Sequence, residues 1–169
     1  MRFCRDLRTI RNNRKKEPDA AWGFTAGVTI THIIVRPGDA LWQQGWRPDR
    51  CYITESPLVY FNRVDGFPVA VPPYFMFDGA TGPAWHLWDH PYGQFVEAAC
   101  VHDYMLGRAA KLMHEGTAEW DAIKLHHAQS LRHEADLLMP EMVEWLGGDA
   151  WKCFAAFVAV RSNSIIQGY

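Results

Sequence analysis

The chain has 169 residues, of which 49% are hydrophobic and 21% are charged, a length and composition typical of one soluble globular domain. Its net charge of −2 conceals an asymmetry, because residues 1–16 contain seven Arg or Lys and one Asp, whereas the remainder contains eighteen acids and ten basic residues. The four cysteines form no C-x-x-C pair, which argues against a zinc knuckle, and their spacing gives no evidence for a disulfide scaffold. No apolar run is long enough to span a membrane.

Residues 1–23 are predicted to be a basic arm and linker, and residues 24–169 a single domain. The charges from Arg2 to Lys16 could dock on an acidic partner, on nucleic acid or on a lipid surface. The alternative is a solvated terminus without a binding role. No apolar segment of a signal peptide follows the arm, so we expect the chain to be cytoplasmic or to be carried out of the cell by something else.

The first half of the domain is rich in strand patterns. Phe24–Val35 has many β-branched residues and is predicted to be a strand, whereas Arg36–Arg50 contains Pro and Gly and is predicted to be a loop. Pro57–Val64 and Pro68–Phe77 are predicted to be two strands of a hairpin, because Asp65-Gly66 between them is a strong turn signal.

The second half has helical patterns. Gln94–Leu106 contains no helix breaker and predicts a helix, followed by a connection over Gly107–Gly116. A long helix is expected from Thr117 to about Met139, where Pro140 ends or kinks it, and a last helix from Ala150 to Arg161. The predicted fold class is therefore α+β: a small antiparallel β-sheet in the N-terminal half, then three helices, with the two long ones packed antiparallel.

The adjacent pair His102-Asp103 is the first candidate for chemistry. Consecutive helical residues point about 100° apart, so the two side chains can face different partners. If the long helices pack antiparallel, Asp136 can meet His102 and orient it as a general base. Asp103 would then be free to bind a hard cation together with oxygens from the loop that begins at Asp78.

Two alternatives remain open at this point. Asp136 is four residues after Arg132, so it could form an ordinary surface ion pair on one helix. His102 could be a core histidine that is bonded to a backbone carbonyl. An HD-type phosphohydrolase is a further possibility, but it would require more His ligands and an all-helical chain.

Val59–Arg161 resembles an uncharacterised family encoded by tailed phages and prophages. The shared motifs are V-P-x-x-F, D-G-A-S/T-x-P, A-A-x-x-H-D-Y, R-x-x-A-D and A-V-R, which match Val71-Pro72 with Phe75, Asp78–Pro83, Ala98–Tyr104, Arg132–Asp136 and Ala159–Arg161. This resemblance implies a phage origin and a place in the virion or the host cytoplasm. It implies no particular activity.

A more distant resemblance is to secretory phospholipases of the A-two type. It is carried by Asp78-Gly79-Ala80-Thr81, Pro91–Phe95, Ala99–Asp103 and Ala135-Asp136. The resemblance implies that His102 activates water, that Asp136 orients His102, and that Asp103 and Asp78 hold calcium.

Two functions of different kinds follow. In the first, the protein is a calcium-dependent ester hydrolase that acts on lipid or cell-envelope material. In the second, it is a non-catalytic virion component of the tail, baseplate or an adaptor, and it uses the same scaffold for contacts with other virion proteins.

Overall fold

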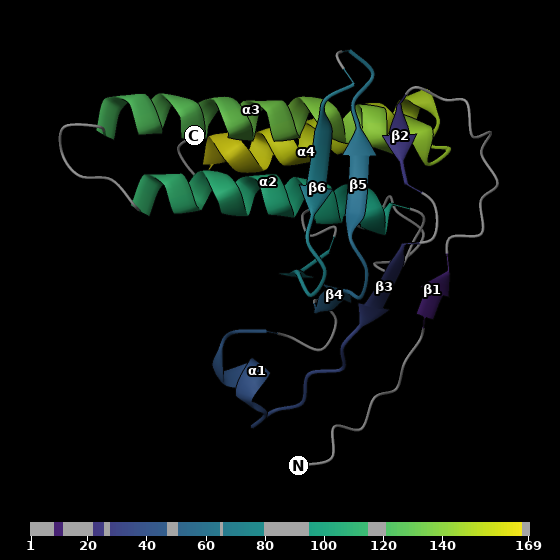
Figure 1. Ribbon diagram of the computed structural model, residues 1–169, viewed down its shortest axis with the longest axis vertical. Coiled ribbons are helices and arrows are strands. Elements are labelled where there is room, and N and C mark those ends of the chain that lie inside the picture. Colours follow the sequence, from purple (N-terminus) through teal and green to yellow (C-terminus); the bar gives the residue numbers. More distant parts are fainter. Residues whose placement is uncertain are drawn as a thin grey trace.

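The computed structural model describes residues 9–11, 22–25, 28–46, 51–64, 66–79, 95–114 and 121–166. Within these residues the fold is α+β, with two small antiparallel sheets in the N-terminal half and three long helices in the C-terminal half, as predicted (Figure 1). The helices α2, α3 and α4 lie side by side with similar axes, and α2 and α3 run antiparallel (Figure 1). Among the described residues, no helix has the length and apolar character needed to cross a membrane.

Both sheets are small and wholly antiparallel. The first has the order β1-β3-β4-β7, with β1 at Thr9–Arg11, β3 at Thr29–His32, β4 at Tyr52–Thr54 and β7 at Met76–Phe77. The second has the order β2-β5-β6, with β2 at Gly23–Phe24, β5 at Leu58–Phe61 and β6 at Pro68–Val71. The chain therefore passes between the two sheets several times, although β3 and β4 share the first sheet and β5 and β6 share the second.

The predicted hairpin is present between β5 and β6. Leu58 lies opposite Val71 and Phe61 lies opposite Pro68, so the two strands are paired along their whole length. Gly66 adopts a φ of 66°, in the left-handed region that a tight turn requires and that glycine enters readily. Its neighbour Asp65 lies outside the described residues.

Several predicted strand boundaries were wrong. The expected strand Phe24–Val35 is divided into β2 and β3, which belong to different sheets. The expected strand Pro68–Phe77 is likewise divided into β6 and β7, because Pro72 and Pro73 lack the N–H groups that a ladder needs. Between these two strands Tyr74 adopts a φ of 64°, which turns the chain from one sheet to the other.

Three short elements were not predicted. The strand β1 lies inside the predicted basic arm, β4 precedes the hairpin, and the one-turn helix α1 at Ala40–Gln43 lies in the predicted loop. Strands of three residues, such as β1 and β4, carry too little sequence pattern to be recognised. They form because each pairs with one of the two edges of β3. The rest of the arm, residues 1–8 and 12–21, and with it the predicted linker, lies outside the described residues.

The long helices are longer than predicted. The helix α2 spans Val96–His114 and continues through Gly107, α3 spans Asp121–Trp145, and α4 spans Ala150–Ile166. Pro140 therefore does not end α3, because one lost backbone hydrogen bond is outweighed by packing against α2 and α4. Asp149 caps α4 by accepting a hydrogen bond from the Lys152 N–H at 2.8 Å. The predicted cap Thr117 lies outside the described residues.

The core lies between the strands and the helices. The helix α2 is central, since it contacts β5, β6 and β7 as well as α3. Small buried side chains on both helices, such as Ala98 of α2 and Ala135 of α3, permit a close approach of the helices. The larger core side chains come from the strands and from the end of α3, namely Tyr52, Leu58, Tyr60, Val71, Met142 and Val143.

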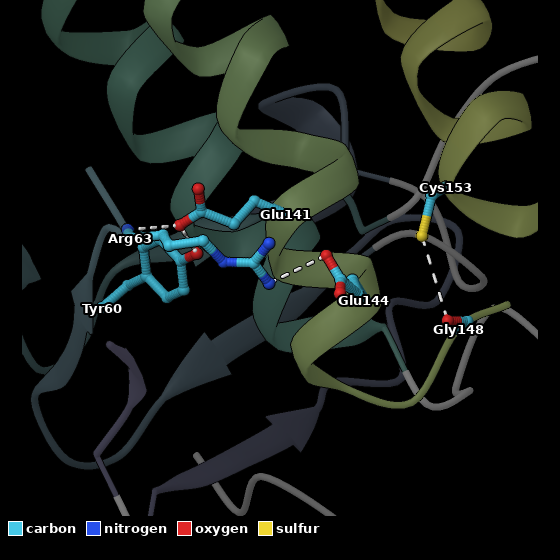
Figure 2. A network of polar contacts seen from close by, with 6 residues as sticks. All are labelled: Tyr60, Arg63, Glu141, Glu144, Gly148 and Cys153. Carbon is cyan, nitrogen blue, oxygen red and sulfur yellow. Dashed lines mark hydrogen bonds and ion pairs between the residues drawn. The ribbon is translucent and has the colours of Figure 1, made fainter. Parts of the chain in front are cut away.

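Polar contacts also join the hairpin to the end of α3 (Figure 2). The buried Tyr60 hydroxyl donates a hydrogen bond to Glu141, and the Arg63 N–H donates to the same carboxylate at 2.7 Å. The Arg63 guanidinium pairs with Glu144 at 2.9 Å. The carboxylates of α3 therefore fix the helix to β5 and to the residues that follow it.

Candidate functional site

His102 and Asp136 meet across the interface of α2 and α3. His102 lies near the middle of α2, and Asp136 lies one turn before Pro140 in α3. The distance between His102 Nε2 and Asp136 Oδ1 is 3.2 Å, and both side chains are buried. The contact predicted from antiparallel packing is therefore present.

The hydrogen bond to Asp136 determines which imidazole nitrogen of His102 carries the proton. A carboxylate only accepts, so Nε2 must carry the proton that it donates to Asp136. In the neutral imidazole, Nδ1 then keeps its lone pair. This Nδ1 faces Asp103, whose Oδ1 lies 3.7 Å away, beyond ordinary hydrogen-bond distance. The pair therefore has the geometry of a base with an orienting acid.

The charge state of His102 depends on its neighbours. Burial by itself lowers the pKa of the imidazole, but the close contacts with Asp103 and Asp136 and the negative charges of these carboxyl groups outweigh this effect. The net result raises the pKa of His102 to about 9. The imidazolium is therefore favoured as long as both carboxylates carry uncompensated charge.

Asp103 and Asp78 form a second pair beside the imidazole. Burial raises the pKa of Asp103 to about 7, the proximity of His102 opposes that shift, and the charge of Asp78 together with a hydrogen bond between the two carboxyl groups adds to it. Asp103 Oδ2 is buried and has no hydrogen-bond partner among the residues that the structure describes. Two facing carboxyl groups with an unsatisfied oxygen are the ligand type that hard divalent cations prefer.

Asp78 is positioned by the end of β7 and by the glycine that follows it. Gly79 has a φ of 79°, and a Cβ atom at this position would lie 2.7 Å from Cε2 of Tyr52. The backbone therefore approaches the Tyr52 ring so closely that only glycine fits. This close approach restricts the backbone at Gly79, the residue that follows Asp78.

Arg161 of α4 is a member of the site that the sequence analysis did not assign. Its Nη1 lies 3.5 Å from Asp136 Oδ2, on the oxygen that His102 does not contact. The sequence held one signal for this residue, since Arg161 ends the last of the shared motifs. Its contact with Asp136 depends on the packing of α4 against α3 and could not be read from spacing.

The carboxyl groups of Asp78 and Asp103 are oxygen ligands of the kind that calcium takes, but two carboxyl groups do not complete its coordination. Calcium takes six to eight oxygen ligands, often including backbone carbonyls and water. Among the described residues, no group of three or more His, Cys, Asp and Glu side chains is placed to hold a metal ion. Further ligands would therefore have to be backbone oxygens, water or substrate. Cys51, Cys100 and Cys153 are free thiols and form no part of the cluster.

A family model with the description "Protein of unknown function (DUF1353)" matches residues 53–160, more than half of the chain. The chain belongs to this family. The DUF1353 match includes Asp78, His102, Asp103 and Asp136, and it ends one residue before Arg161. The family description names no activity, host or partner. No curated protein matches the chain, and no solved structure matches it.

Proposed function

We propose that the protein is a calcium-dependent ester hydrolase that acts on lipid or cell-envelope material. The observation that carries the proposal is the buried contact of His102 with Asp136, next to the paired carboxyl groups of Asp78 and Asp103. A general base with its orienter and a cation site are the parts that metal-assisted ester hydrolysis requires.

Each residue has a distinct role in this proposal. Asp136 accepts a hydrogen bond from the Nε2–H group and holds the imidazole in the tautomer whose Nδ1 carries no proton. His102 Nδ1 takes the proton of the attacking water and then passes it to the leaving alcohol. When bound, the cation supplies an electrophile that stabilises negative charge on the ester carbonyl oxygen.

The two halves of the site depend on each other. Asp103 lies between the imidazole and Asp78, and its negative charge favours imidazolium over the neutral base. A general base must be neutral before it accepts a proton. Compensation of the carboxyl charges is therefore expected to bring His102 into its working form.

Calcium titration of the wild type and of two variants tests the proposal. Asp103→Asn should lose saturable calcium binding in calorimetry, because one of the two paired carboxyl groups is removed. His102→Ala should retain calcium binding but lose hydrolysis of p-nitrophenyl butyrate and of phosphatidylcholine vesicles by a factor of about 10²–10⁴. Asp39→Asn is the matched control, since Asp39 is an exposed carboxylate at the start of α1.

The outcomes separate the two parts of the site. Equal heats of calcium binding in the wild type and Asp103→Asn would remove Asp103 from the cation site. Calcium-dependent hydrolysis that survives in His102→Ala would remove the general base.

A second candidate is a virion component without catalytic activity, and two observations favour it. His102 is only 8% exposed, which leaves little room for a substrate at the imidazole. On α4, Trp151, Phe154 and Val158 are exposed at helical spacing, and exposed aromatic side chains are typical of contact surfaces. In this proposal the assembly is a phage virion, as the resemblance to the phage family suggests, and the basic arm docks on an acidic virion partner.

The same measurements decide between the two candidates. A structural component would show neither hydrolysis nor calcium binding, and His102→Ala would change only the free energy of unfolding. Binding of calcium with hydrolysis that depends on His102 would exclude the structural role as the sole function.

A further inference from the structure

Arg161 is a partly exposed residue that contacts the buried Asp136. Its side chain is 39% exposed, whereas the side chain of its partner Asp136 is 1% exposed. The contact between them, Nη1 to Oδ2 at 3.5 Å, is an ion pair rather than a close hydrogen bond. Because the Arg161 side chain is partly exposed, its guanidinium can meet a ligand from solvent while it stays paired with Asp136.

Arg161 lies beside a cluster of acidic side chains. The described part of the site contains three carboxyl groups, those of Asp78, Asp103 and Asp136. An anionic substrate would be repelled by such a cluster unless a cation received it. Arg132 of α3 is buried, whereas the guanidinium of Arg161 reaches solvent next to the His102–Asp136 pair.

We infer that Arg161 binds an oxyanion group of the substrate, a phosphate or a carboxylate, on the solvent side of Asp136. The inference rests on the proposed hydrolase and narrows its substrates to esters that carry negative charge. The planar guanidinium matches two oxygens of such a group at once, which an ammonium cannot do. Asp136 contacts the guanidinium through Oδ2 and the imidazole through Oδ1. An anionic group bound to Arg161 would therefore lie near the base His102, with the Asp136 carboxylate between them.

Binding of small anions tests the inference without turnover. Inorganic phosphate is titrated into the calcium-free protein, followed by calorimetry and by the Nε–Hε signal of Arg161 in nitrogen-15 NMR. The wild type should bind phosphate saturably, and Arg161→Gln should bind it roughly tenfold to a hundredfold more weakly. Arg161→Lys should also be weaker than the wild type, because the charge remains and the fork is lost.

Arg63→Gln is the matched control. Arg63 is also a half-exposed arginine that pairs with a carboxylate, but its partner is Glu144 in the last turn of α3 (Figure 2). Its loss should leave phosphate affinity unchanged. Thermal melting followed by circular dichroism shows whether Arg161→Gln is folded, and Arg161→Lys replaces it in the comparison if it is not.

Two further probes identify the source of the oxyanion. Dibutyl phosphate represents a phosphodiester and butyrate represents a carboxylate, and the tighter binder identifies the class that Arg161 receives. The inference is overturned if no probe binds the wild type saturably, or if Arg161→Gln and Arg161→Lys both bind as tightly as the wild type. Absence of ester hydrolysis with intact phosphate binding would overturn the proposed hydrolase and leave the anion site of Arg161 standing.

Discussion

At the scale of single residues, Asp136 joins polar side chains from three helices. His102 of α2 contacts one of its oxygens and Arg161 of α4 contacts the other, while Asp136 itself lies on α3 and is fully buried. A buried charge without compensation costs several kcal/mol, on the order of 3–5 when a partner is removed. The two partners offset that cost, and the same contacts orient the imidazole.

Gly79 gives a residue-scale prediction that leaves every carboxyl group in place. Gly79→Ala would strain a backbone with φ at 79° and press a Cβ atom against Tyr52. Asp78, the preceding residue, should be displaced, and calcium affinity measured by calorimetry should fall roughly tenfold, as it does when outer-shell support is lost.

The control for this variant is Gly66→Ala. Gly66 also has a positive φ, of 66°, but a Cβ there would meet no atom within 4 Å. Both variants should lose about 1 kcal/mol from backbone strain. If Gly79→Ala binds calcium as tightly as Gly66→Ala, the backbone at Gly79 does not position a calcium ligand.

At the scale of elements, α3 connects the site to the strands. Its middle carries Asp136, and its last turns carry Glu141 and Glu144. Glu141 accepts a hydrogen bond from Tyr60, and Glu144 forms an ion pair with Arg63 (Figure 2). Pro140 lies between these two regions and lacks the N–H that would bond to the carbonyl of residue 136. The helix continues because its buried face packs on both neighbouring helices.

Tyr60 gives the element-scale prediction. Its hydroxyl is buried and donates to Glu141, so Tyr60→Phe should lower the free energy of unfolding by about 2 kcal/mol at neutral pH, as measured in urea. Burial, followed by the hydrogen bond to Glu141, raises the pKa of Tyr60 from its ordinary value of 10. Stability from this group is therefore complete below about pH 10 and is lost as the pH rises further, because the unfolded chain releases the proton first.

The difference between the wild type and Tyr60→Phe should consequently narrow above pH 10. The control is Tyr74→Phe, since Tyr74 is largely exposed. A difference between the wild type and Tyr60→Phe that stays constant from pH 8 to pH 11 would contradict the role of the buried hydroxyl.

At the scale of the whole molecule, one core joins the helices to the strands. The central α2 contacts both, and the core continues from the hairpin through α2 to the end of α3. The helices and the strands should therefore unfold together in one transition.

Two adjacent leucines of α3 test the position of this core. Leu138 and Leu137 are neighbours in the same helix, but Leu138 is 8% exposed and Leu137 is 50% exposed. Leu138→Ala should lower the free energy of unfolding by about 2–5 kcal/mol, and Leu137→Ala by less than about 1 kcal/mol. The measurement is urea unfolding followed by tryptophan fluorescence, and similar losses in both variants would place the core elsewhere.

The fold class and the central contact of the site were predictable because they depend on strong local patterns. Asp65-Gly66 between two β-rich segments predicted the hairpin, and the uninterrupted segment before Leu106 predicted a helix that carries His102. Boundaries were less predictable. Gly107 and Pro140 are helix breakers by their intrinsic propensity, yet both lie inside helices that tertiary packing supports.

The sequence alone was enough to place the hairpin and then three helices, with an imidazole and two acids at spacings that antiparallel helices can join. Only the tertiary structure decided how the strands divide into two sheets, since pairing partners are chosen by contacts between distant segments. Only the tertiary structure also brought Asp78 to Asp103 and Arg161 to Asp136. Those contacts join separate elements, and no local periodicity fixes the distance between side chains that meet only when helices and strands pack.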